Sequence, residues 1–207
     1  MADRGTGEGS MDEPLRAHTI NEARYWLRVA PCPQCGSGPL RSRVAADAAA
    51  GEPITVDAEC AQCGLRRGYR FVCEHGVGQS APDAETINPT DEPSRLIDVA
   101  QWLSLFYVLI EAGARERSAS ATRLAGYRAA LCLAEALKFY GEGELPPEEA
   151  FFSARTLQSF RDHPESFTRQ RLQDRRSKLP AMGTMARRVS QDRPKRRRRW
   201  WPFGRRR

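Results

Sequence analysis

Two matched cysteine pairs constrain the fold of this chain more than any other feature of its sequence. Each pair encloses two residues and is followed directly by glycine, at Cys32-Pro33-Gln34-Cys35-Gly36 and Cys60-Ala61-Gln62-Cys63-Gly64. The glycine allows a tight turn that aims backbone N–H groups at the sulfurs, so each pair presents two thiolates to one point. Two such turns complete a tetrahedral shell. The sequence therefore predicts a metal bound by Cys32, Cys35, Cys60 and Cys63.

The predicted zinc is structural rather than catalytic. Four thiolates leave Zn2+ no position for water or substrate. A module this small buries too little apolar surface to fold alone, and structural zinc contributes about 10–16 kcal/mol of apparent binding free energy. Redox chemistry at the first pair is the alternative, but the βαβ pattern of a thioredoxin-like site is missing from the sequence. With neither a signal peptide nor a membrane-spanning run in the sequence, we expect a reducing, cytoplasmic location that favours metal over disulfides.

Short strands surround the two cysteine turns. Residues 39–46 can form a first strand, and apolar and polar side chains alternate over 54–60 and again over 69–73. On these strands and the four cysteines, residues 31–75 resemble the zinc-ribbon family. The resemblance implies an antiparallel ribbon and structural Zn2+, but no single function, because ribbons occur in many kinds of protein. Rubredoxins hold iron in similar paired turns, generally with the proline in the second turn rather than the first. Iron is the alternative metal.

The sequence divides into five segments. Residues 1–17 are rich in glycine and charge and are predicted to be disordered. Residues 18–75 hold a short helix, which starts at the capping-box sequence Thr19-Ile20-Asn21-Glu22, and then the ribbon. A linker over 76–91, a helical bundle over 92–179 and a disordered tail over 180–207 follow. The expected fold class is α+β: a small three-stranded zinc ribbon followed by an antiparallel helical hairpin or bundle, with disordered tails at both ends.

Helical periodicity organises the second half of the chain. Apolar residues from Leu96 to Ile110 favour a long helix that is capped by Thr90 or Asp91 and ends before Gly113. Residues 118–140 are its expected antiparallel partner. Pro146-Pro147 is predicted to open a third helix, and 165–178 a last one. The outer surface of this bundle is available to a protein partner.

Basic charge is concentrated near the C-terminus. The chain carries a net charge of +7, whereas residues 187–207 hold eleven Lys or Arg and one acid, so the remainder is mildly acidic. Arginine releases counterions from nucleic acid, and tryptophan stacks on bases. The same side chains suit an anionic membrane surface, where the aromatic rings enter the interface. The expected contact residues are Lys195, Arg196, Arg197, Arg198, Arg199, Trp200, Trp201, Phe203, Arg205, Arg206 and Arg207.

A second basic group follows the second cysteine turn. Arg66, Arg67 and Arg70 can bind phosphates from the ribbon face. Equally, three arginines on the outer side of an edge strand discourage pairing with another chain. The sequence leaves both interpretations open.

The remaining reactive side chains are isolated in the sequence. Cys73 lies about 30 Å along a strand from the second turn, too far to be a ligand, and is predicted to be a small core residue. Cys132 is predicted to be a buried thiol within a helix. His75 is predicted to be a loop histidine. His18 and His163 stand among polar neighbours and are predicted to be solvated or capping residues.

The sequence contains no recognisable catalytic motif. These patterns together predict a non-enzymatic binding or adapter protein, with no small-molecule substrate, whose basic aromatic tail contacts nucleic acid. The alternative is a peripheral membrane adapter, in which the same tail binds anionic lipid and the helical surface binds a protein partner.

Overall fold

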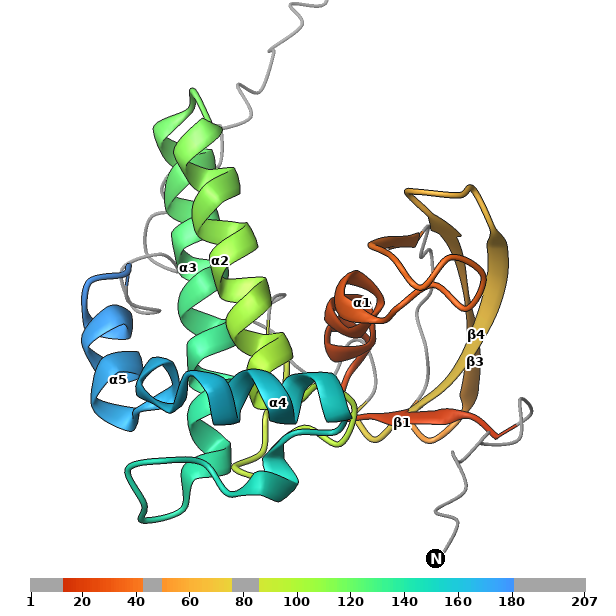
Figure 1. The fold of residues 1–207 in the computed structure, drawn as a ribbon. Coiled ribbons are helices and arrows are strands. Elements are labelled where there is room, and N and C mark those ends of the chain that lie inside the picture. The colour runs from red at the N-terminus through yellow and green to blue at the C-terminus, as the bar shows by residue number, and fades with distance from the viewer. Residues whose placement is uncertain (1–12, 43–49, 76–85, 181–207) are drawn as a thin grey trace, which may run out of the picture.

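The computed structural model describes residues 13–42, 50–75 and 86–180. A sheet half comes first in the chain and a helical half second, which confirms the α+β class (Figure 1). The sheet half contains β1 (Leu15–Ala17), α1 (Ile20–Val29), β2 (Leu40–Ser42), β3 (Pro53–Cys60) and β4 (Arg66–Cys73). The helical half contains α2 (Val99–Arg115), α3 (Ala119–Leu137), α4 (Ala154–Asp162) and α5 (Arg169–Ser177), with 3-10 turns η1 (Lys138–Tyr140), η2 (Glu148–Ala150) and η3 (Pro164–Phe167).

Four strands form one mixed sheet in the order β1-β4-β3-β2. The strands expected around the cysteine turns are β2, β3 and β4, and they pair antiparallel. The prediction of three strands was wrong, because β1 pairs in parallel with β4 and places Leu15 opposite Phe71. β1 also lies within 1–17, the segment predicted to be a disordered tail. Three residues give no periodic signal, and their partner strand lies far along the chain.

α1 covers one face of the sheet. Thr19 caps the helix, as predicted, by accepting a hydrogen bond from the Glu22 N–H at 3.3 Å. Glu22 reaches back past Thr19 to the N–H of His18. One turn further along the helix, Trp26 stands edge-on against the rings of Tyr69 and Phe71 in β4. These rings help close a small apolar core between α1 and the sheet.

α2 and α3 form the antiparallel hairpin that the sequence predicted (Figure 1). α2 begins later than expected, because Asp98 caps it in a capping box with Gln101 and also accepts the Phe152 N–H at 3.1 Å. Gly113, expected beyond the helix end, is buried within it. A Cβ on Gly113 would lie 3.0 Å from the Ala125 Cβ, so glycine allows the two helices to approach closely here.

The C-terminal helices pack against the hairpin (Figure 1). The helix predicted to open at Pro146-Pro147 is only the short η2 turn, after which the chain is extended at Phe151. The third helix is α4, which Ser153 caps. The extended backbone lets Phe151 enter the core, where its ring stacks on Phe160 with centroids 4.6 Å apart. A last helix is present as α5, preceded by η3.

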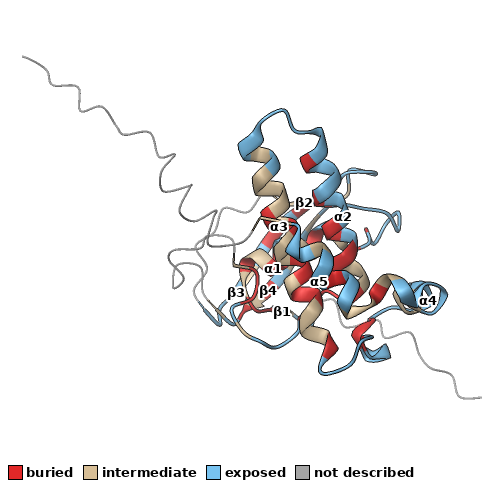
Figure 2. Cartoon of the chain, turned by 90° about the vertical axis from the view of Figure 1, so that its left-hand side faces the viewer, coloured by how far each residue is buried: buried red, intermediate tan, exposed pale blue. Residues whose placement is uncertain are grey.

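The two halves pack on one another. Residues 86–91, predicted to end a linker, include Ile87 with 1% of its surface exposed. The hydroxyl of Thr19 in the sheet half donates to the Ile87 carbonyl. Tyr25 of α1 contacts Trp102 of α2, with ring centroids 6.0 Å apart. Figure 2 shows buried residues (red) gathered where α1, α2, α3 and the sheet meet. The remaining linker residues and most of both predicted tails lie outside the described residues.

Candidate metal centre

The four predicted cysteine ligands lie together at one end of the sheet. Their sulfur atoms are all within 4.8 Å of one another. Cys32 Sγ lies 3.6 Å from Cys63 Sγ, and Cys35 Sγ lies 3.7 Å from Cys60 Sγ. Four thiolates bound to one zinc at about 2.3 Å would be about 3.8 Å apart in a tetrahedron. The sulfur positions therefore fit a metal such as zinc.

Both cysteine turns have the same backbone geometry. The first cysteine of each accepts a hydrogen bond at its carbonyl from the glycine N–H, at 2.8 Å for Cys32 with Gly36 and 3.0 Å for Cys60 with Gly64. The two glycines have φ of 65° and 75°, a left-handed conformation that favours glycine. Cys32 and Cys60 are buried, while the second cysteine of each pair is exposed. The repeat in the sequence is thus also a repeat in backbone structure, and each turn contributes two sulfur atoms to the cluster.

The sulfur cluster is electrostatically suited to a cation. The Cys63 N–H, followed by the Gln62 N–H at 3.4 Å from Sγ, lowers the pKa of Cys60 to about 6 against the opposing effect of desolvation. At Cys63 the Leu65 N–H lowers the pKa, but desolvation and the neighbouring sulfurs outweigh it and raise the pKa to about 12. Four thiols this close cannot all ionise unless positive charge compensates them, which a bound metal ion supplies.

The two remaining cysteines belong to the apolar cores, as predicted. Cys73 and Cys132 each have 0% of their surface exposed. Desolvation raises the pKa of Cys73 to about 11 and raises that of Cys132 further. Both are therefore protonated thiols that lack the thiolate character needed for reactivity at neutral pH.

The three arginines that follow the second turn do not share one face of β4. Arg66 and Arg70 lie on the exposed face, whereas Arg67 lies on the face of α1 and covers the Tyr69 ring at 5.5 Å. Arg66 pairs with Glu59 of β3 at 3.1 Å. β4 lies between β1 and β3, but β1 pairs with it only over residues 71–73. The stretch 66–70, which carries the three arginines, pairs with β3 alone among the described strands, so their interpretation as protection for a free edge stays open beside phosphate binding. The expected contact residues of the tail, 195–207, lie outside the described residues.

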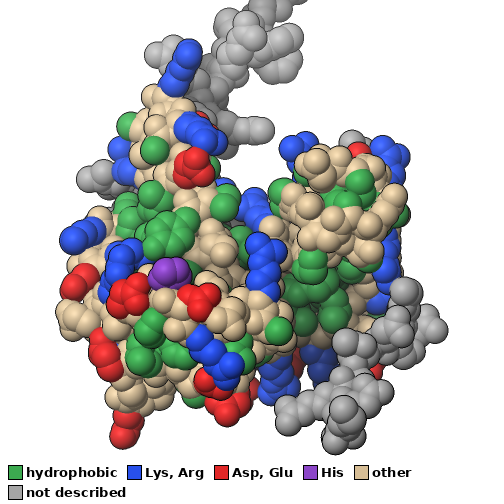
Figure 3. All heavy atoms as spheres, viewed as in Figure 1, with side chains coloured by type: hydrophobic (Ala, Val, Ile, Leu, Met, Phe, Trp, Pro, Cys, Tyr) green, Lys and Arg blue, Asp and Glu red, His purple; other side chains and the backbone are tan. Residues whose placement is uncertain are grey.

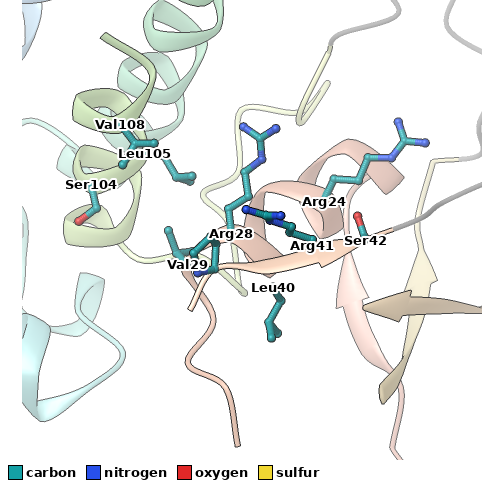
Figure 4. Close-up of a pocket in the computed structure, with 10 residues that line it drawn as sticks. Arg24, Arg28, Val29, Leu40, Arg41, Ser42, Ser104, Leu105 and Val108 are labelled. Atoms are coloured by element: carbon teal, nitrogen blue, oxygen red, sulfur yellow. The ribbon is translucent and has the colours of Figure 1, made fainter. Parts of the chain in front are cut away.

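A cavity of about 750 Å³ lies where α1, β2 and α2 meet. Arg24 and Arg28 of α1 and Arg41 of β2 line it (Figure 4). Figure 4 shows them across the cavity from α2, which contributes Leu105 and Val108. Figure 3 shows the wider hollow between the hairpin and the sheet half, with Lys and Arg side chains (blue) along it. This arrangement combines positive charge with an apolar wall.

The arginines of this cavity are available to an anion. All three are exposed, and none of the described residues that line the cavity is acidic. None of the three guanidinium groups forms an ion pair with a carboxylate of the described residues. Arg24 only donates to the Asn21 side chain at 3.2 Å, and Arg28 lies over the Tyr25 ring at 5.7 Å. As far as the structure describes the chain, the charge of the group is thus uncompensated.

This arginine group was not predicted from the sequence. Arg24 and Arg28 are four residues apart in a predicted helix, which places them on one face, and that spacing was a usable signal. Arg41 joins them only because α1 packs beside β2. His18 was also misread as a solvated or capping residue: it has only 3% of its surface exposed.

Comparisons of the chain with protein families, with curated proteins and with solved structures find no match. Within the part of the chain that the structure describes, no helix is both long and apolar enough to cross a membrane.

Proposed function

We propose that this protein is a non-enzymatic binding protein in which a zinc ribbon holds an arginine-lined cavity against a helical hairpin, and that the cavity and the C-terminal tail bind single-stranded nucleic acid. The observation that carries the proposal is the convergence of Arg24, Arg28 and Arg41 on one apolar-walled cavity. The ribbon's contribution is positional. Its strand β2 carries Arg41, and β2 pairs with β3 beside the cysteine turns.

The chemistry of the cavity suits a nucleotide unit. Guanidinium groups bind phosphate oxygens in two-pronged hydrogen bonds, and the apolar wall at Val29, Leu105 and Val108 can receive a base or sugar. Its volume is in the range of small-ligand sites, too confined for a duplex but large enough for one flexible strand. The net charge of +10 over residues 187–207 adds a second polyanion-binding segment.

The proposal is tested by salt-dependent binding of a single-stranded oligonucleotide, followed by fluorescence anisotropy. Each phosphate contact contributes about 0.7 to the slope of log K against log salt for single strands. We expect Arg24→Ala with Arg28→Ala to weaken binding and to lower the slope by up to about 1.4, for two lost contacts. The same pair of substitutions is then made in a chain ending at residue 186, so that cavity and tail are measured separately.

Arg171→Ala is the matched control. Arg171 is an exposed arginine of α5, which packs against α3 on the other side of the hairpin from α1 (Figure 1). It should leave affinity and slope nearly unchanged. Equal effects of the control and the cavity variants would contradict a role of the cavity in nucleic-acid binding. Unchanged binding by the truncated chain would contradict a role of the tail.

A membrane surface is the competing target, because lipid headgroups also present phosphate beside apolar chains. Co-sedimentation with anionic and neutral vesicles therefore accompanies the anisotropy assay. Loss of anionic-vesicle binding in the cavity and tail variants, with oligonucleotide binding intact, would overturn the nucleic-acid proposal in favour of a peripheral membrane adapter.

A further inference from the structure

A second group of potential metal ligands lies at the end of the sheet away from the cysteine turns. His18 directly follows β1, and Glu74 and His75 directly follow β4. One ring nitrogen or carboxylate oxygen from each residue lies within 4.8 Å of the others. β4 has eight residues and therefore separates the two groups by about 25 Å.

Parallel pairing of β1 with β4 builds this group. The strand register, which ends with Ala17 opposite Cys73, continues through backbone hydrogen bonds from Glu74 N to Ala17 O and from His75 N to His18 O, both 2.9 Å long. His18 is also held from α1, because the buried Glu22 carboxylate accepts its backbone N–H. The backbone positions of all three residues are thus fixed by the fold.

The buried imidazole of His18 makes no hydrogen bond to the described residues. His18 is 3% exposed, and neither of its ring nitrogens has a hydrogen-bond partner among the described residues. Nδ1 lies 3.2 Å from Glu74 Oε2 without the geometry of a hydrogen bond. Leaving a buried polar atom unpaired costs about 1–3 kcal/mol. A ring nitrogen and a carboxylate oxygen at this distance, without hydrogen-bond geometry, are placed as two ligands of one cation would be.

We propose that His18, Glu74 and His75 form a second metal site, which takes a divalent transition-metal ion of the zinc type. Two imidazoles and one carboxylate are a donor set that zinc accepts, with the fourth position left to water or to an external ligand. Bond lengths of about 2.0–2.2 Å would bring the donor atoms about 3.4 Å apart, a shift that side-chain rotation can supply. The imidazoles disfavour Ca2+ and Mg2+, which prefer oxygen ligands.

The surroundings of the site support this assignment. Glu74 directs Oε2 toward His18, while Oε1 lies 3.8 Å from the Arg95 guanidinium, an outer partner of the kind that orients ligating carboxylates. His75 is half-buried and Glu74 is exposed, so an ion has a route from solvent. The proposal stands independently of nucleic-acid binding.

Cobalt(II) titration of the full-length protein separates the two sites. The four-thiolate site produces sulfur-to-cobalt charge-transfer absorption, whereas a His2Glu site has no sulfur and adds only weak visible bands. We expect two equivalents to bind, the second without further charge-transfer absorption. In Glu74→Gln with His75→Ala the second equivalent should weaken at least tenfold, with the first retained as evidence that the chain is folded.

His163→Ala is the matched control, because His163 also lies near a carboxylate, 3.6 Å from Glu165, but is 68% exposed on the helical half. It should bind both equivalents as the natural chain does. Binding of a single equivalent by the natural chain, or an unchanged second equivalent in the double variant, would overturn the site. As a check without any variant, the imidazole nitrogen resonances of His18 and His75 should shift with the second equivalent of zinc, and unshifted resonances would contradict the proposal.

Discussion

The sheet half and the helical half bury different kinds of side chain. Between α1 and the sheet the buried residues include many small ones, such as Ala17, Ala23 and Ala58, together with cysteines. Around α2 and α3 they include Trp102, Phe106 and Leu133. Burial stabilises by about 25 cal/mol for each Å² of apolar surface, so packing stabilises the helical half, whereas we expect the sheet half to depend more on a metal at its cysteine cluster.

This difference shows how a small sheet can keep a defined position against the larger helical half. Trp26 packs against both cores, and through it α1 joins the metal-stabilised half to the packed half. The cavity arginines lie on the sheet side of this junction. A metal bound by the cysteines would therefore fix the position of the proposed binding cavity without taking part in it.

The largest effect is expected from removing the metal centre. Cys60→Ser, or a strong chelator, should unfold β2, β3 and β4 while α2 and α3 remain folded, because structural zinc contributes about 10–16 kcal/mol to such modules. Hydrogen exchange by NMR would show lost protection over 53–73 and retained protection over 99–137. Cys132→Ala, a cysteine change in the helical half, should leave the metal content unchanged. Equal loss of protection in both halves would contradict the prediction that only the sheet half depends on the metal.

Trp102→Ala tests the helical half. Trp102 has 0% of its surface exposed, and truncating a buried tryptophan costs about 3–5 kcal/mol. Denaturant unfolding should show this loss in α2 and α3, and cobalt charge-transfer absorption should persist at denaturant concentrations that unfold the helices. Simultaneous loss of both signals would instead mean that the two halves unfold as one unit.

The stability of the helical half and that of the sheet half should depend on pH with opposite signs. Desolvation raises the pKa of Glu135 to about 7, with Lys138 Nζ at 2.9 Å opposing the shift. Since the folded state binds this proton more tightly than the unfolded state, stability from Glu135 is present below pH 4.5 and is lost as the pH rises through about 7. The stability that metal binding gives the sheet half should change in the opposite direction. It should decrease as the pH falls, because acid protonates the thiolates.

Glu135→Gln isolates the helical contribution. It should flatten the decline of helical stability between pH 4.5 and 7.5, at about 1.4 kcal/mol for each unit of pKa difference removed. Thermal unfolding at a series of pH values, with the exposed Glu149→Gln as control, measures it. A decline that persists in Glu135→Gln would place its origin elsewhere.

The smallest effect is expected on the outer face of the sheet. Arg66 and Glu59 pair across β4 and β3 at 3.1 Å, with side chains 79% and 45% exposed. Exposed pairs contribute about 0.2–1 kcal/mol, so Glu59→Gln should barely change unfolding and should matter less at high salt. A cost as large as that of Trp102→Ala would mean that surface charge, rather than the metal, stabilises the sheet half.

Several elements could be predicted because their signals are local. The glycine after each cysteine pair defines a turn, alternation predicts β3 and β4, and Ser118 begins α3 as expected. The start of α2 was missed although Asp98 and Gln101 form a capping box, the same local pattern that predicted the start of α1. Only the additional bond from the Phe152 N–H to Asp98 comes from a distant segment and leaves no local signal.

The sequence by itself determined the two cysteine turns and the strands β2, β3 and β4 beside them, since spacing within a turn controls where two sulfurs point. Only the tertiary structure decided that β1 joins β4, and with it that His18 lies beside Glu74 and His75. It likewise decided that Arg41 faces the arginines of α1. The physical reason is that these groups depend on strand register and helix packing between distant segments, which leave no periodic trace in either segment.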